Sequence, residues 1–151
     1  MRVVVQVVKS ASVTVEGKIT GQIDKGYLLY VGFKTNDDKD IIDRMINKLL
    51  KLRIFQDDNG LTNLSINDVN GEILAISQFT LYADTKKGNR PSFISAMKAE
   101  ESKELYDYFI RKLEETFGHV ERGIFHSEML VESINDGPFT ILLDSEELFN
   151  K

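Results

Sequence analysis

The chain has 151 residues, a formal net charge of −5, 42% hydrophobic and 28% charged residues, and no cysteine. This length suits one domain with its own core, the acidic balance argues against a general nucleic-acid binder, and the lack of cysteine excludes disulfides and thiolate chemistry. No apolar run could span a bilayer and residues 1–6 do not resemble a signal peptide, so we expect a cytoplasmic protein without a membrane partner.

The first third of the chain predicts several strands and one helix. Valine-rich residues 2–8 indicate a strand, residues 12–23 indicate a β-hairpin that turns near Gly17, and residues 27–33 indicate a central strand. Asp37 or Asp38 can cap the helix that follows. Apolar residues of this helix recur every three or four positions, which places them on one face against the sheet: Ile41, Ile42, Met45, Ile46, Leu49 and Leu50.

The rest of the chain predicts a buried strand at residues 73–76, a second helix from about 100 to 117, and closing strands at 120–124, 129–134 and 139–143. Gly118 is the expected stop of the second helix. These elements predict an α/β fold in a single domain spanning residues 1–151. In this fold a large mixed sheet or partial barrel is covered by two main helices, and an acidic tail at 145–151 is peripheral.

Two polar stretches stand at predicted strand ends. Ser77-Gln78-Phe79-Thr80 closes the buried strand, where hydrogen-bonding groups would be costly if they were left unpaired. The second stretch, at residues 135–140, contains Gly137-Pro138. Either stretch could simply satisfy the polar groups of its own loop, and residue chemistry alone leaves that alternative open.

Few other residues indicate a familiar catalytic device. The only histidines, His119 and His126, form no metal-binding pair, so we expect solvated loop positions and no metal site. The sequence has no Gly-x-Ser-x-Gly elbow and no glycine-rich phosphate loop. A hydrolase built from this chain would therefore need an already activated substrate, which it would position and bind through backbone donors.

Together, the two polar stretches resemble the paired signature of the D-aminoacyl-tRNA deacylases. The similarity extends to residues 11–15, 53–55, 89–93 and 105–109, and it runs collinearly from residue 1 to about residue 143. The resemblance implies the D-aminoacyl-tRNA deacylase-like fold. It also implies a homodimer, without a cofactor, that hydrolyses the ester between a D-amino acid and the 3′-terminal adenosine of tRNA. This is chiral proofreading, in which glycyl-tRNA mischarged on tRNA-Ala is a further substrate and DNA is not an expected partner.

The resemblance assigns the substrate pocket to the first stretch. In the family this motif lines the pocket, which carries over to Ser77, Gln78, Phe79 and Thr80. Phe79 would offer an aromatic surface to the adenosine, and a core position is its structural alternative. Thr80 is the family's candidate nucleophile, but a threonine hydroxyl without a base is a weak one. We therefore expect main-chain donors near Phe79 and Thr80 to do most of the catalysis.

The resemblance assigns chiral selection to Gly137-Pro138. In the family this peptide is cis, reaches into the pocket of the other subunit, captures the substrate's amino group and leaves no room for an L side chain. An ordinary turn is the alternative that the residues themselves favour. The chain departs from the family at Val7, where many members carry a basic residue that helps to hold this element.

The loop after the first motif contains three cations, Lys86, Lys87 and Arg90. They are predicted phosphate contacts for the acceptor end of tRNA, and a solvated charged loop is the alternative. Two other functions remain open at this point. One is a related deacylase with relaxed or L-amino-acid specificity, and the other is a non-catalytic nucleic-acid-binding dimer of the same fold.

Overall fold

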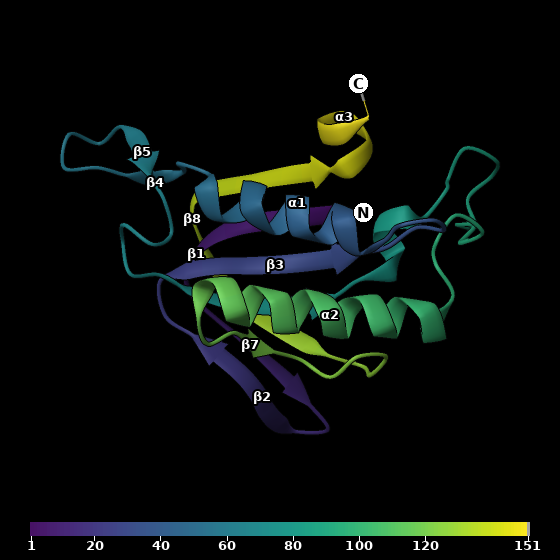
Figure 1. Cartoon of the computed structure of the whole chain (residues 1–151). Coiled ribbons are helices and arrows are strands. Elements are labelled where there is room, and N and C mark those ends of the chain that lie inside the picture. The colour runs from purple at the N-terminus through teal and green to yellow at the C-terminus, as the bar shows by residue number, and fades with distance from the viewer. Residues whose placement is uncertain (151) are drawn as a thin grey trace.

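The computed structural model describes residues 1–150 and contains a strongly bent sheet with two long helices packed on one side (Figure 1). The strands are β1 (Arg2–Val15), β2 (Lys18–Ile23), β3 (Gly26–Gly32), β4 (Phe55–Gln56), β5 (Thr62–Leu64), β6 (Glu72–Ser77), β7 (Glu121–Arg122) and β8 (Leu130–Asp144). The helices are α1 (Lys39–Lys51), α2 (Ala99–Phe117) and α3 (Ser145–Phe149), together with a 3₁₀ turn, η1 (Phe79–Tyr82). The predicted α/β fold with two main helices is confirmed.

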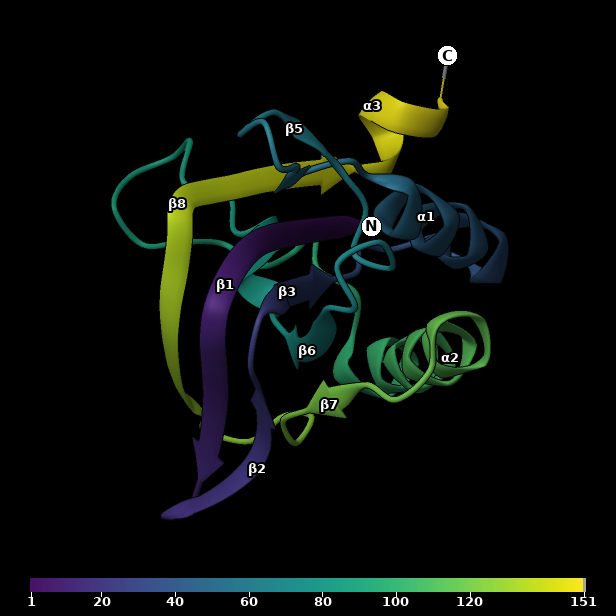
Figure 2. The same cartoon turned by 90° about the vertical axis from the view of Figure 1, so that its left-hand side faces the viewer.

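Strand β1 organises the sheet because it is long enough to pair with three other strands. Its first half pairs antiparallel with β3 and its second half with β2, while β8 runs antiparallel along its other edge. Strand β6 extends the sheet parallel to β3, and β7 is parallel to β6. Figure 2 shows that β1 and β8 bend together. The main-chain N–H of Gln22 in β2 donates to Glu121 in β7 at 3.2 Å, so the sheet curls toward a barrel.

Two strands are longer than the sequence pattern predicts. Residues 2–8 and 12–15 both belong to β1, and the expected strands at 129–134 and 139–143 both belong to β8. The polar residues Lys9 and Ser10 interrupt the apolar pattern of β1, yet pairing with β8 continues through this region with shifts in register. Such bulges let a strand bend without ending, which explains the difference from the prediction.

Helices α1 and α2 cover one face of the sheet, as predicted for the two main helices. The Asp38 side chain caps α1 by accepting a hydrogen bond from Ile41 N at 2.9 Å. The other candidate cap, Asp37, is buried and instead pairs with the amino group of Met1 at 2.7 Å. Gly118 ends α2 with a φ of +121°, the left-handed conformation that glycine tolerates. Within residues 1–150 no helix is both long and apolar enough to cross a membrane.

Candidate active site

The first polar stretch lies where β6 ends and η1 begins. Because β3 and β6 are parallel, their carboxyl ends meet at the same edge of the sheet, a common place for ligands in α/β proteins. The N–H of Gln78 donates to the carbonyl of Val31 at 2.8 Å, which holds the start of the turn against β3. Gly32 permits this approach, since a Cβ at that position would lie 2.7 Å from the carbonyl oxygen of Gln78.

A cavity of about 420 Å³ opens at this edge. Ser77 and Gln78 are half-buried in its wall, and Phe79 stands at its mouth. Thr80 follows directly outside the lining and is exposed. The structure therefore brings Ser77, Gln78 and Phe79 together around one cavity, with Thr80 at its margin.

Phe79 does not occupy the core. Its side chain is 53% exposed, and its ring meets the ring of Phe93 edge to face, with 5.0 Å between centroids and 65° between planes. An exposed aromatic ring beside a cavity can stack on a nucleotide base. Of the two alternatives drawn from the sequence, the structure thus supports the accessible ring.

The surroundings of Thr80 contain a hydrogen-bond donor but no base. The Gln78 side-chain amide donates to the Thr80 hydroxyl oxygen, and no carboxylate or imidazole within residues 1–150 hydrogen-bonds to that hydroxyl. The main-chain N–H groups of Phe79 and Thr80 open η1, where a helical turn has no internal acceptor for them. Neither N–H makes a main-chain hydrogen bond in the described part of the chain. Two donors are therefore available beside the cavity, whereas an activated nucleophile is not.

The opposite wall of the cavity comes from the segment that follows β7, which the sequence did not assign to the substrate pocket. Phe125, His126 and Met129 line the cavity from this side. His126, expected at a solvated loop position, is exposed and lies on this wall, and it has a φ of +66°, which is unusual for a residue with a side chain. The parallel pairing of β7 with β6 places this wall beside the cavity. The pairing involves only two residue pairs, and the sequence pattern does not predict which strand β7 joins.

Tyr106 of α2 supports this wall from behind. Its ring lies 5.6 Å from that of Phe125, and its hydroxyl donates to the carbonyl of Ala75 at 3.0 Å. His119, in contrast, lies away from the cavity and contacts Glu121 at 2.6 Å. That hydrogen bond is the main reason why the pKa of Glu121 is lowered.

Gly137 and Pro138 lie in an exposed bulge of β8. Gln6 of β1 pairs with Thr140, and Val8 pairs with Asn135, so residues 136–139 loop outward opposite Val7 alone. The Gly137-Pro138 peptide is cis, and Gly137 has a φ of +135°. Hydrogen bonds within the loop hold its shape.

These hydrogen bonds involve the Asn135 side chain, whose oxygen accepts a hydrogen bond from Phe139 N at 2.9 Å. Its amide nitrogen donates to the Thr140 hydroxyl, also at 2.9 Å. The bulge borders a separate cavity of about 150 Å³, together with Val7 and Lys25. Among residues 1–150, none lines both this cavity and the one at Ser77, so a single chain does not bring Gly137-Pro138 to that pocket.

Lys86, Lys87 and Arg90 lie on a loop that extends from the sheet beyond η1 (Figure 1). Main-chain hydrogen bonds between Asp84 and Ser92, at 2.8 and 2.9 Å, close the loop at its base. All three cations are exposed, and none forms an ion pair with residues 1–150. They are thus available to an anionic partner.

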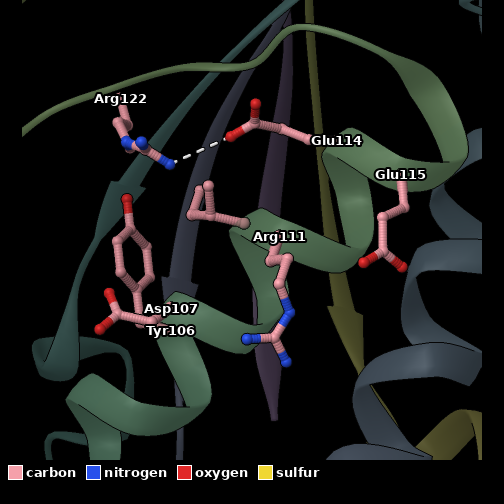
Figure 3. Close-up of a pocket in the computed structure, with 7 residues that line it drawn as sticks. Tyr106, Asp107, Arg111, Glu114, Glu115 and Arg122 are labelled. Atoms are coloured by element: carbon pink, nitrogen blue, oxygen red, sulfur yellow. Dashed lines mark hydrogen bonds and ion pairs between the residues drawn. The ribbon is translucent and has the colours of Figure 1, made fainter.

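A larger hollow of about 710 Å³ on the flank of α2 is a weaker candidate (Figure 3). Glu114 and Arg122 form an ion pair there, 3.1 Å between nitrogen and oxygen, and the Tyr106 hydroxyl already donates a hydrogen bond to the Ala75 carbonyl. Burial raises the pKa of Tyr106, which keeps the phenol protonated. Across the described residues, no three His, Cys, Asp or Glu side chains group closely enough to hold a metal.

Comparison with known proteins gives consistent matches over nearly the whole chain. A family model described as D-Tyr-tRNA(Tyr) deacylase matches residues 4–144. A D-aminoacyl-tRNA deacylase of Lactobacillus acidophilus is 56% identical over 144 residues, which cover 95% of this chain and 99% of that protein. A solved structure of a c-Myc DNA unwinding element binding protein is 38% identical, with a TM-score of 0.90 and 95% and 98% of the two chains covered. A probable eukaryotic D-amino acid tRNA deacylase, 18% identical over 94% of this chain and 97% of its own, shares the fold with a TM-score of 0.82.

Proposed function

The chain belongs to the D-Tyr-tRNA(Tyr) deacylase family, and on that premise we propose that it hydrolyses D-aminoacyl-tRNA to a free D-amino acid and tRNA. The observation that carries this proposal is the pair of unengaged N–H groups at Phe79 and Thr80 beside the cavity lined by Ser77 and Gln78. An aminoacyl ester is already reactive, so donors aimed at its carbonyl can supply much of the catalysis. The family model over residues 4–144 and the 56% identical relative confirm the family resemblance inferred from the motifs.

In the proposed reaction, water attacks the ester carbonyl and the N–H groups of Phe79 and Thr80 bind the oxyanion that forms. The neighbouring hydroxyl of the terminal ribose assists the attacking water. Collapse of the tetrahedral intermediate breaks the bond to the 3′ oxygen, which takes up the proton that the attacking water gives up. Thr80 orients the turn and does not attack, because its hydroxyl contacts the amide of Gln78 and no base.

We propose that the enzyme is a homodimer whose subunits meet along β8. Within residues 1–150, β8 pairs only with β1, so its second edge is unpaired. This strand also exposes apolar side chains, with Leu130 75%, Ile134 57% and Leu142 56% exposed. A two-fold axis at this edge would cover the same patch on both subunits.

The dimer would bring the bulge of one subunit to the pocket of the other. Gly137-Pro138 protrudes from the same strand and has no pocket of its own at Ser77. In the proposed complex, its carbonyls hold the amino group of the substrate, and its backbone fills the space that an L side chain needs. A D side chain points outward, and glycine has none, so glycyl-tRNA mischarged on tRNA-Ala is a second substrate.

Lys86, Lys87 and Arg90 would contact phosphates near the acceptor end of the tRNA. We place the reaction in the cytoplasm, where aminoacyl-tRNA is used, within a single domain of residues 1–151.

Two alternatives have specific support. Val7, opposite the bulge, favours a deacylase with relaxed or L-amino-acid specificity. The 38% identity to a protein named for binding a DNA element supports nucleic-acid binding, which the alternative of a non-catalytic nucleic-acid-binding dimer requires.

The deciding experiment is to incubate the protein with D-Tyr-tRNA, L-Tyr-tRNA and Gly-tRNA-Ala and to follow loss of each ester. We expect rapid loss of the D-tyrosyl and glycyl esters and slow loss of the L-tyrosyl ester. Comparable hydrolysis of the L and D esters would favour the relaxed enzyme. Hydrolysis of none of them, with tight binding of nucleic acid, would favour the non-catalytic dimer.

A further inference from the structure

We propose that Phe93 is a substrate-positioning residue, which holds the Phe79 ring in the orientation that stacks on the terminal adenosine. This inference rests on the proposed function, because it assigns Phe79 to the nucleoside end of the substrate. Phe93 itself does not line the cavity at Ser77, so its contribution passes through Phe79.

The backbone on both sides of Phe93 is anchored although its side chain lies at the surface. On one side, Ser92 is joined to Asp84 by two main-chain hydrogen bonds. On the other side, Ala96 N donates to the Phe93 carbonyl at 3.1 Å, and Met97 N donates to the carbonyl of Phe33 at 3.0 Å. Phe33 directly follows β3, so Phe93 is tied to the same sheet edge that carries the cavity.

The rings of Phe79 and Phe93 are both partly exposed and pack against each other. Phe79 is 53% exposed and Phe93 is 39% exposed, and their edge-to-face contact has 5.0 Å between centroids. A half-exposed phenylalanine that lacks such a neighbour can change rotamer freely at the surface. An edge-to-face pair adds attraction beyond simple burial. Phe79 remains 53% exposed in this pair, so part of its ring is accessible to a base.

The loop that precedes Phe93 also carries positively charged side chains. Lys86, Lys87 and Arg90 lie between the two residues, Asp84 and Ser92, that close the loop, and Phe93 directly follows the closure. Unpaired cations beside exposed aromatic rings are the combination that binds single-stranded nucleic acid, with phosphates on the cations and bases on the rings. The unpaired 3′ end of a tRNA is a single strand of this kind. Phe93 thus couples the phosphate-binding loop to the ring at the pocket.

The test compares Phe93→Leu with Phe93→Tyr and with the neighbouring Ile94→Ala, whose side chain is 90% exposed in the wild-type protein. With D-Tyr-tRNA, we expect Phe93→Leu to raise KM by roughly twofold to tenfold, with kcat changed by less than about twofold. Phe93→Tyr keeps the edge-to-face ring and should restore KM, and Ile94→Ala should match the wild type. Unfolding midpoints of all variants establish that each is folded.

A double-mutant cycle tests whether Phe93 acts through Phe79. If it does, Phe79→Leu/Phe93→Leu should bind no more weakly than Phe79→Leu alone, because the ring to be positioned is already gone. Additive losses, or a Phe93→Leu variant that behaves like Ile94→Ala, would overturn the inference.

Binding of a single-stranded RNA oligonucleotide ending in CCA separates this inference from the proposed chemistry. Weaker binding by Phe93→Leu, in a protein that hydrolyses no aminoacyl ester, would support the ring pair and refute the deacylase. Hydrolysis by the wild type with no effect of Phe93→Leu on KM or on RNA binding would refute the ring pair alone. A wild-type protein that neither hydrolyses the esters nor binds the oligonucleotide would refute both.

Discussion

Arg2 and Leu81 are joined by a hydrogen bond, 2.8 Å long, from the Arg2 guanidinium to the Leu81 carbonyl. This contact ties the first residue of β1 to the turn that carries Phe79 and Thr80. The guanidinium also pairs with Asp144 at 2.8 Å and lies over the ring of Tyr82, 4.7 Å from its centroid. One arginine thus connects the start of the chain, the end of β8 and the site.

Arg2→Lys should lower both stability and activity. Lysine keeps the charge, but its three donors share one nitrogen, so it cannot reproduce the two separate guanidinium nitrogens that bind Asp144 and Leu81. We expect the free energy of unfolding to fall by roughly 1–2 kcal/mol and kcat/KM to fall as η1 loosens. Urea titration and deacylation assays measure the two effects. Arg111→Lys is the control, since Arg111 is exposed on α2, and equal stability of the two variants would contradict the role of Arg2.

Asp144→Asn should change how stability depends on pH. Burial by itself would raise the pKa of Asp144, but hydrogen bonds from Arg2 and from Glu146 N, with the positive charge of Arg2, together lower it. A depressed pKa stabilises the fold above the unfolded value of about 3.9, and this stabilisation is lost as pH falls through the folded value.

At pH 7 the Asn variant should therefore be less stable than the wild type by roughly 1–3 kcal/mol. The difference should shrink as pH falls below about 4, where Asp144 of the unfolded chain protonates, and through the lower folded value. Urea titrations at pH 7, 5 and 3 give the comparison. A stability difference that is constant over this range would show that the charge of Asp144 does not matter.

Thr80→Ala should reduce turnover without abolishing it. The hydroxyl accepts a hydrogen bond from Gln78, and loss of one such contact predicts a decrease in kcat of roughly tenfold. Thr80→Ser keeps the acceptor and should be close to wild type. Single-turnover kinetics with D-Tyr-tRNA measures the loss, and isolation of a covalent aminoacyl-Thr80 species would establish a nucleophile instead.

Gly137→Ala should relax discrimination between D and L substrates. Gly137 has a φ of +135°, and an added Cβ would lie 3.0 Å from Phe139 N, so the bulge must change shape. The readout is the ratio of kcat/KM for D-Tyr-tRNA and L-Tyr-tRNA. Gly60→Ala is the matched control, because Gly60 also has a positive φ but open space around it. An unchanged ratio in Gly137→Ala would exclude the bulge as the chiral filter.

Lys86→Ala/Lys87→Ala should weaken tRNA binding most at low salt. Two lost phosphate contacts predict that the slope of log affinity against log salt becomes shallower by roughly 1.4. The control is Lys48→Ala/Lys51→Ala, which removes two exposed lysines of α1. Binding isotherms at several salt concentrations measure both slopes, and equal slopes would show that the loop makes no phosphate contacts.

Features that depend on neighbouring residues along the chain could be predicted from residue patterns alone. The apolar spacing of residues 41–50 placed the buried face of α1, Gly118 marked the end of α2, and Gly17 marked the hairpin turn. The same holds for the two motifs, because each is a short run whose residues carry the family resemblance. Local spacing decides these features, so a linear pattern is sufficient to predict them.

The contacts between distant segments, in contrast, became evident from the fold and not from residue patterns. The pairing of β7 with β6 brought Phe125 and His126 to face Ser77, and the edge contact brought Phe93 to Phe79. The fold also places the Gly137 bulge away from the pocket of the same chain. These relations arise from strand pairing and side-chain packing between residues that are far apart in sequence. Their energies depend on the whole fold, so no local pattern in the chain encodes them.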